Sequence, residues 1–340
     1  MRRNYAYPVL WILLTVALAG CRQEPLPETE DAIRFSVASS TVAGLETKAG
    51  PTSASYLEDK GIAVYGSYGT TNPPTTVFDK TTPFTYVAST NTLSYSPLKY
   101  WHRDEPYGFR AVSPATTEVT GNGNKIDIDY NIASGYDLLV ASASVASAPP
   151  ANNTVGLTFI HACAAVRFLF RDATVAEDAT TAPGNYRIKS FALQNVYAAG
   201  TLAYTGDSSA SPVTYGTGGE WSYSGARASS VCSWSGSYEV TAAYNPITGR
   251  EWYYPIPQDL NVNDSKHAAI HFTYTVGNDT QELPATLSLE KFNGANVIWE
   301  PGKVYTYKIQ IQTKAITFDV EWANWTETDN TPLIEPEPTY

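Results

Sequence analysis

The chain of 340 residues has few basic side chains, few residues of the types that bind metals, and a single methionine. It contains 22 Lys and Arg against 33 Asp and Glu, a formal net charge of −11. A basic surface for phosphate backbones is therefore lacking, which excludes nucleic-acid binding. The 3 Cys and 4 His form no Cys-x-x-Cys or His-Glu-x-x-His motif, so no metal or redox centre is predicted.

Motifs of common catalytic sites are missing as well. The sequence has no G-x-S-x-G, P-loop or G-x-G-x-x-G pattern. Asp127-Ile-Asp-Tyr-Asn begins like a calcium loop, but Ile132 stands where the turn needs Gly, and we interpret the segment as a strand. His267 and His271 lie four apart in a β-like segment, which favours strand positions over zinc ligands. We predict that the protein is not an enzyme and uses no cofactor.

The residues that are abundant indicate a folded, all-β protein. Hydrophobic residues make up 43% of the chain and charged residues 16%, which excludes a disordered polymer. Tyr is frequent, and Gly and Pro recur at the short intervals typical of many strands joined by turns. The length suits two domains. The Pro-, Ser- and Ala-rich stretch at 142–154 predicts a boundary near residue 150, between an N-terminal β-sandwich at 49–150 and a C-terminal one at 151–340.

The first twenty residues have the order of a secretory signal peptide. Arg2 and Arg3 precede an apolar run at 9–18, about half the length of a membrane-spanning helix. Leu-Ala-Gly-Cys21 follows, which resembles the lipobox of bacterial lipoproteins. We therefore expect residues 1–20 to be removed, Cys21 to be acylated, and an acidic, Pro-containing tether to follow it. Loss of Arg2 and Arg3 leaves 20 basic and 33 acidic residues, a net charge of −13, so the acyl chains alone would provide anchoring to the outer membrane.

Alternating apolar residues predict three strands of particular interest. Ile33, Phe35 and Val37 alternate with polar residues and form an isolated strand before the main body of the chain. A segment at 159–170 is predicted to be one long strand, with His161 and Cys163 on its polar face. Near the C-terminus, a strand is predicted by the alternation of Ile316, Phe318, Val320 and Trp322.

Two further features leave alternatives open. Export places Cys163 and Cys232 in an oxidising compartment, where they are either packing residues or one disulfide. The second feature is a set of Trp residues. Apolar sugar faces stack on indole rings, so an exposed group of Trp side chains would bind glycans. The residues concerned are Trp221, Trp234, Trp252, Trp322 and Trp325. Core packing is the more frequent role for such side chains.

Several segments, taken in order, resemble the fimbrillin, or type V pilin, family. The resemblance starts at Cys21, continues with a short strand and Lys48-Ala49, and covers nearly the whole chain. It includes Leu98-Lys-Tyr-Trp and Tyr136-Asp-Leu-Leu-Val-Ala. The segments with most weight are the His-containing one that begins at Val155 and Trp299-Glu-Pro-Gly-Lys-Val-Tyr-Thr-Tyr. The resemblance to this family implies two tandem transthyretin-like β-sandwiches and a role in a cell-surface fimbria that serves adhesion.

The resemblance also implies a mechanism of assembly. In such pilins a protease removes the N-terminal strand of a lipidated precursor, and the groove left behind accepts a strand from another subunit. In this sequence the removable strand is Ile33, Phe35 and Val37, and the candidate cleaved bond is Lys48-Ala49. The alternating strand with Ile316 and Trp322 at its ends is the candidate donor. The implied partners are other pilin subunits, outer-membrane lipid through Cys21, and a receptor or glycan on another surface.

Two departures keep other roles open. Family precursors are typically cut after Arg, whereas this chain has Lys48. The segment after Trp325 is short and acidic, so the last predicted strand is either a donor or an ordinary internal strand. The alternatives to a stalk or tip subunit are a permanently lipidated pilus anchor and a glycan-binding surface lipoprotein.

Overall fold

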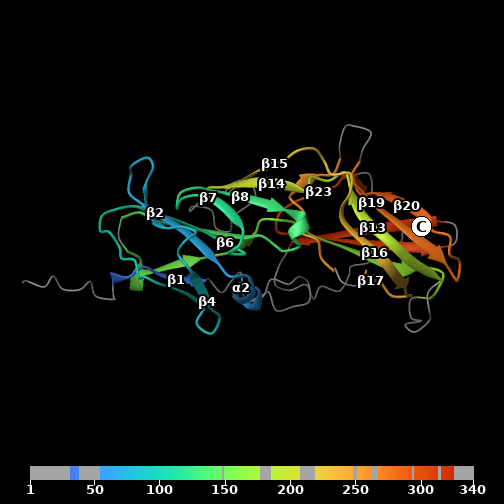
Figure 1. Cartoon of the computed structure of the whole chain (residues 1–340), viewed down its shortest axis with the longest axis horizontal. Coiled ribbons are helices and arrows are strands. Elements are labelled where there is room, and N and C mark those ends of the chain that lie inside the picture. The colour runs from blue at the N-terminus through green and yellow to red at the C-terminus, as the bar shows by residue number, and fades with distance from the viewer. Residues whose placement is uncertain are drawn as a thin grey trace, which may run out of the picture.

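The structure is a computed structural model that describes residues 31–37, 54–147, 149–176, 185–206, 219–247, 251–261, 267–292, 295–312 and 315–324. Strands dominate these residues, which confirms the predicted all-β fold. The molecule is elongated, with the first strands at one end and the last ones at the other (Figure 1). No helix in the described part of the chain is long and apolar enough to span a membrane.

Two sheets face each other at the N-terminal end. One has the order β10-β1-β5-β4 and the other β11-β9-β6-β2-β3. Their shared core is rich in aromatic residues, among them Phe35, Phe78 and Phe109. The strands are β1 (Arg34–Val37), β2 (Ala63–Tyr68), β3 (Thr75–Phe78), β4 (Phe84–Val87), β5 (Thr92–Tyr95), β6 (Tyr107–Ser113), β9 (Leu139–Val145), β10 (Thr154–Leu157) and β11 (Ile160–His161).

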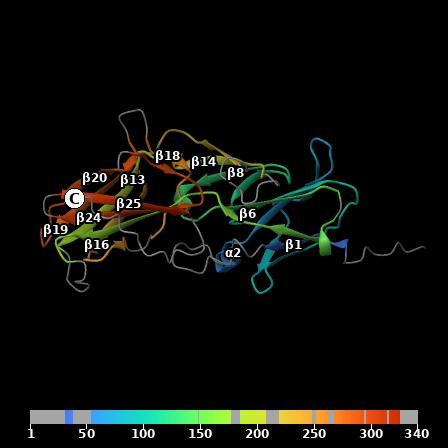
Figure 2. The same cartoon turned by 180° about the vertical axis from the view of Figure 1, so that it is seen from behind.

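A second pair of sheets forms the C-terminal end. Their orders are β17-β12-β24-β25 and β16-β13-β19-β20, and they enclose a core that includes Phe170, Phe272 and Trp299. Figure 2 shows β24 and β25 on the rear side of the molecule. The strands are β12 (Ala165–Asp172), β13 (Tyr186–Gln194), β16 (Val231–Val240), β17 (Asn245–Pro246), β19 (Ala269–Val276), β20 (Leu283–Ser288), β24 (Lys303–Gln312) and β25 (Ala315–Asn324).

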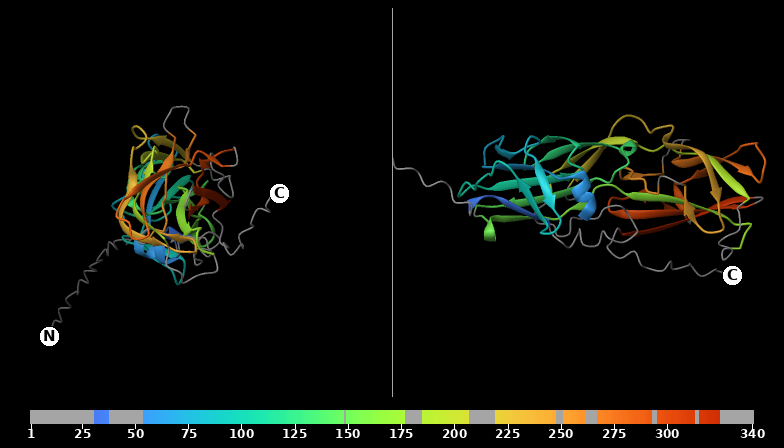
Figure 3. Two further views of the ribbon diagram at one scale, coloured as in Figure 1. Left: turned by 90° about the vertical axis from the view of Figure 1, so that its right-hand side faces the viewer. Right: turned by 60° about the horizontal axis from the view of Figure 1, so that its bottom comes forward.

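A fifth sheet, of order β15-β14-β8-β7, contains strands from both halves of the chain. Here β8 pairs antiparallel with β14 over six residues. The view in the right panel of Figure 3 shows this region between the two ends. Its strands are β7 (Glu118–Gly121), β8 (Ile126–Asn131), β14 (Ala199–Tyr204) and β15 (Gly219–Tyr223). Two small two-stranded sheets are formed by β18 (Gln258–Asp259) with β23 (Ile298–Trp299) and by β21 (Lys291–Phe292) with β22 (Ala295–Asn296).

Strands β10 and β11 follow residue 150 but pair with strands of the first half, β1 and β9. The division into domains stays a prediction, and this pairing favours a boundary between β11 and β12. The predicted long strand at 159–170 is wrong, because the chain leaves one sheet after His161 and enters another at Ala165. Between them the Ala162 amide donates to the Leu138 carbonyl, and the Gly302 amide donates to the Cys163 carbonyl.

Short helices interrupt the strands. The helix α2 (Ala54–Lys60) was not expected, because its seven residues are too few to show a helical stripe. Its Tyr56 and Leu57 side chains are nevertheless part of the N-terminal core. Two 3-10 turns, η2 (Ile132–Ser134) and η3 (Ala151–Asn153), complete the described helices. The segment 252–257 makes only an isolated bridge, Val166 to Tyr253, since Pro255 and Pro257 cannot donate to a ladder.

In the described residues, Cys163 and Cys232 form no disulfide with each other, and both are buried. Cys163 lies in the core cluster between the two ends, and Cys232 lies in the C-terminal core. Burial raises the pKa of Cys163 well above its ordinary value, which lowers the thiolate fraction.

We expect both thiols to resist alkylation in the native protein, because each is shielded from solvent and one is held protonated. The chain from Arg22 to Tyr340 should gain no alkyl group under native conditions and two in denaturant without reductant, as measured by intact mass. A mass that shows two groups only after reduction would instead indicate a disulfide.

Candidate functional site

Strand β1 occupies the middle of its sheet, between β10 and β5. It runs parallel to β10, with Phe35 beside Val155 and Val37 beside Leu157. On its other side it runs antiparallel to β5, with Phe35 beside Leu93. Because an interior strand satisfies the backbone groups of both neighbours, its removal would leave two unpaired edges facing one another.

The side chains predicted to fill a groove are buried, as the alternation requires. Ile33 and Phe35 are each 1% exposed, and Val37 is 3% exposed. The Phe35 ring lies in edge contact with four other rings, whose centroids are 5.3 to 6.3 Å away. These rings belong to Phe78, Phe84, Tyr95 and Phe109. Arg34, on the opposite face, is exposed.

Backbone hydrogen bonds also hold the residues on either side of the β1 ladder. The Ile33 amide donates to the Lys99 carbonyl at 2.9 Å, and the Val37 amide donates to the Asn91 carbonyl at 2.8 Å. The Trp101 amide donates to the carbonyl of Asp31. The Tyr95 hydroxyl donates to the Ile33 carbonyl at 2.6 Å. The segment from Asp31 to Val37 is therefore held by backbone bonds that any strand of suitable side chains would reproduce.

Of the other processing residues, Cys21, Lys48 and Ala49 lie outside the described residues, as do the predicted signal peptide and most of the tether. The candidate donor strand lies in β25, which pairs antiparallel with β24 from Ala315 to Asn324. Val320 is 3% exposed and Ile316 packs against the C-terminal core. Among the described strands, β24 is the partner of β25, so β25 is at the edge of its sheet.

The predicted Trp residues whose side chains the structure describes, Trp221, Trp234 and Trp252, do not gather on one surface. Trp252 is 8% exposed and lies beneath the Arg167 guanidinium, 4.7 Å from its ring centroid. Trp234 packs on the C-terminal core, whereas Trp221 packs on the cluster between the two ends. For Trp322 the structure gives the backbone position only, and Trp325 lies outside the described residues. The three Trp side chains described here serve packing.

The predicted strand positions are confirmed for Asp127, Asp129 and His271, whereas His267 lies before β19 and outside any strand. Asp127 and Asp129 lie on β8 and point away from its buried face. His271 lies on β19, where its ring is hydrogen-bonded to Thr286, while His267 pairs with Glu290. Within the described ranges, no three His, Cys, Asp or Glu residues are placed to hold a metal ion.

Sequence reasoning missed a buried polar cluster between the two ends of the molecule. Asp137 is fully buried, and its Oδ2 atom lies 2.6 Å from His161 Nδ1. The Tyr56 hydroxyl donates to the Asp137 carbonyl at 2.6 Å, and the Tyr130 hydroxyl donates to the Tyr254 carbonyl at 2.7 Å. These groups come from α2, β8, β11 and the residues before β9, so the cluster ties several elements together. No periodic signal marks such a cluster, because its members come from distant segments.

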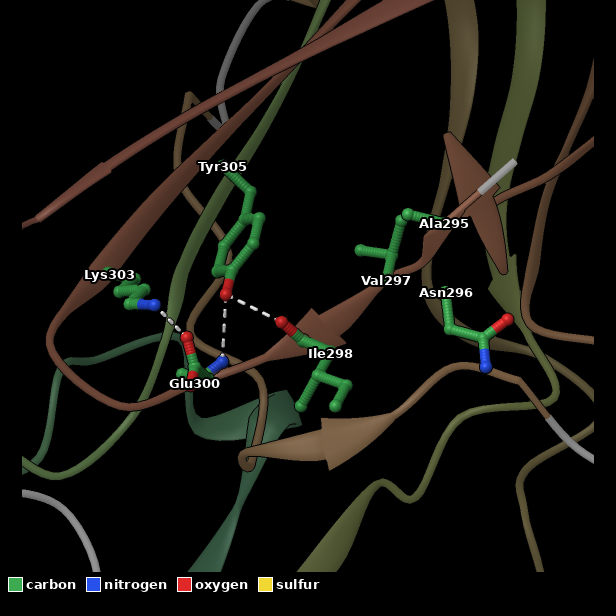
Figure 4. A pocket seen from close by; sticks show the side chains of 7 residues that line it. All are labelled: Ala295, Asn296, Val297, Ile298, Glu300, Lys303 and Tyr305. Atoms are coloured by element: carbon green, nitrogen blue, oxygen red, sulfur yellow. Dashed lines mark hydrogen bonds and ion pairs between the residues drawn. The ribbon is translucent and has the colours of Figure 1, made fainter. Parts of the chain in front are cut away.

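A half-open pocket lies beside β22 and β23 (Figure 4). Ile298, which is 49% exposed, forms part of its wall. The Tyr305 hydroxyl donates to the Ile298 carbonyl and accepts from the Glu300 amide, and Lys303 pairs with Glu300. The polar groups of Tyr305, Glu300 and Lys303 in the wall thus have partners within it. Burial raises the pKa of Tyr305 to about 12.

We expect the protein to lose stability as the pH rises from about 10 to about 12. Unfolded tyrosines release their protons near pH 10, whereas folded Tyr305 keeps its proton until about pH 12. Burial raises the pKa of Tyr56, Tyr130 and Tyr254 as well. Since the folded state then binds more protons than the unfolded state, the unfolding free energy falls across this window. Urea unfolding at several pH values, with phenolate absorbance, measures it. Complete titration of the folded protein near pH 10 would contradict the expectation.

Comparisons with known proteins agree with this fold. A model of fimbrillin-like proteins matches residues 47–325. The chain belongs to the fimbrillin-like family. No curated protein sequence is significantly similar to it. The solved structure of a cell adhesion protein from Bacteroides uniformis is similar, with 14% identity, a TM-score of 0.53 and coverage of 87% of this chain and 98% of that one.

A second solved structure, of a fimbrial protein from Bacteroides vulgatus, has 15% identity and a TM-score of 0.52. It covers 87% of this chain and 99% of its own. At these identities the two structures show a shared fold. In this fimbrillin-like protein, the family match starts at residue 47, so β1 precedes the matched region.

Proposed function

We propose that the protein is a structural subunit of a cell-surface fimbria, that it serves adhesion, and that it is assembled by protease-triggered strand exchange. The supporting observation is that β1 is an interior strand contributed by the N-terminal segment. Its Phe35 and Val37 side chains are buried in the N-terminal core, as is Ile33 just before it, yet β1 contributes only four residues to the sheet. A short, detachable strand in this place works as a plug for a groove that another chain can fill.

The precursor is lipidated at Cys21 and reaches the outer membrane with β1 in place, which shields the apolar groove. Cleavage between Lys48 and Ala49 cuts the link between β1 and α2. The plug is then held by noncovalent contacts alone, so a strand of a neighbouring subunit can replace it. The donor strand is β25.

The proposal is tested by cleavage of the chain from Arg22 to Tyr340 with a lysine-specific protease, followed by intact mass and unheated detergent gels. We expect loss of the segment that ends at Lys48 and a ladder of multimers that resist detergent. The Lys48→Gln variant, which keeps the folded residues unchanged, should remain uncut at this bond and monomeric. A cleaved protein that stays monomeric, with β1 still bound, would contradict strand exchange.

A further inference from the structure

Strand β1 and the edge strand β25 carry the same apolar residues in the same order. Residues 33–37 read Ile-Arg-Phe-Ser-Val, and residues 316–320 read Ile-Thr-Phe-Asp-Val. The three apolar positions of each alternate with polar ones, so in an extended strand they share one face. This inference rests on the proposed function. We propose that the groove left by β1, between β5 and β10, accepts β25 of a second copy in one register, which Tyr95 fixes. In this register Ile316, Phe318 and Val320 take the places of Ile33, Phe35 and Val37.

The shapes of the three buried places favour this alignment over a shifted one. The place of Phe35 is bounded by four rings, so a smaller side chain there leaves a cavity. A shift by two residues would put Val320 in that place and Trp322 in the place of Val37, which is 3% exposed. The first change underpacks the core and the second overpacks it. A shift by one residue would turn the polar residues of the strand inward.

The Tyr95 hydroxyl makes a hydrogen bond that favours the same register. Its ring packs between Phe78 and Phe84, with centroids 5.0 and 5.2 Å away, so it is part of the apolar floor. Its hydroxyl leaves that floor and donates to the Ile33 carbonyl at 2.6 Å. The Lys99 amide donates to the same hydroxyl at 3.3 Å, which holds the oxygen in place. In the proposed register the Tyr95 hydroxyl donates to the Ile316 carbonyl of the incoming strand.

The backbone of the groove provides the remaining contacts. The Lys99 carbonyl, which accepts from the Ile33 amide, would accept from Ile316, and the Asn91 carbonyl would accept from Val320. As a guest, β25 would lie between β5 and β10 and pair on both sides. In its own chain it pairs with β24. Exchange therefore replaces the ten residue pairs of the β24 ladder by two shorter ladders, of four pairs with β10 and two with β5.

The direct test is peptide binding to the cleaved protein. The protein cut after Lys48 is unfolded in urea, freed of the N-terminal segment, and refolded with a fluorescent peptide of residues 315–324. Anisotropy then gives the dissociation constant. We expect saturable binding, at least a hundredfold weaker for the peptide with Phe318→Ala and changed less than threefold for the peptide with Trp322→Ala. Strong dependence on Trp322 would overturn the proposed register.

The role of Tyr95 is tested in the protein. Tyr95→Phe keeps the ring and removes the hydroxyl, so the wild-type peptide should bind about five- to tenfold more weakly. Tyr107→Phe is the matched control, because its hydroxyl accepts from the His102 amide at 2.6 Å, which lies outside β1. It should leave binding unchanged. Equal binding by Tyr95→Phe would overturn the role of Tyr95 alone, whereas absence of binding by the wild-type protein would overturn strand exchange and this inference together.

Discussion

Replacement of Phe35 by Ala should lower the unfolding free energy of the uncleaved precursor by about 3–5 kcal/mol. Such a loss is typical when a buried Phe is truncated and the surrounding side chains cannot collapse into the space. Here the ring is 1% exposed and touches four other rings on rigid strands. Denaturant unfolding of the chain from Arg22 to Tyr340 measures the change.

Two controls separate the loss of the Phe35 ring from a general weakness of β1. Ser36→Ala changes the neighbouring residue on the opposite face and should cost less than about 0.5 kcal/mol. In assembled multimers the segment with residue 35 has been replaced, so Phe35→Ala should leave their detergent resistance unchanged. A loss of less than about 1 kcal/mol in the precursor would show that β1 does not seal the core.

Replacement of His161 by Ala should also cost about 3–5 kcal/mol of unfolding free energy. Its ring lies 2.6 Å from a carboxylate oxygen of Asp137, which is fully buried. Removal of one partner leaves the other as an uncompensated buried group, which costs more than the pair itself contributes. Because the backbone carbonyl of Asp137 accepts a hydrogen bond from the Tyr56 hydroxyl, a displacement of Asp137 should loosen α2 against the rest of the molecule.

The matched control for His161 is His271→Ala. His271 makes one exposed hydrogen bond, to Thr286, so its loss should cost less than about 1 kcal/mol. Urea unfolding gives both free energies, and hydrogen exchange of the α2 amides reports the loosening. Equal stability of the two variants would show that the buried pair contributes no more than a surface contact.

The alternation at Ile33, Phe35 and Val37 predicted a half-buried strand because each strand residue reverses the side-chain direction. The sequence does not predict that this strand lies between two others in a sheet. Val155, which pairs with Phe35 on one side, lies far along the chain, and no local pattern specifies a parallel neighbour at that separation. The same holds for β8 and β14, which pair across the two halves.

The errors have local physical causes. The alternation of apolar residues at 159–170 continues unbroken where the chain passes from one sheet to another. Periodicity alone therefore predicts one strand where the structure has two, β11 and β12. Tyr56 and Leu57 lie in a helix of two turns, too short for a helical period to emerge. Asp137 and His161 are single polar residues within apolar runs, and only the fold brings them into contact.

A reversible covalent lock on β1 tests the central claim most directly. Ser36 and Thr92 are paired across β1 and β5, at a separation that a disulfide spans, so Ser36→Cys with Thr92→Cys should tie the plug to the groove. After cleavage at Lys48, the oxidised variant should remain monomeric on unheated gels, and reductant should restore the ladder. Ser36→Cys alone should assemble under both conditions. Multimers formed by the cleaved, oxidised double variant would contradict assembly through replacement of β1.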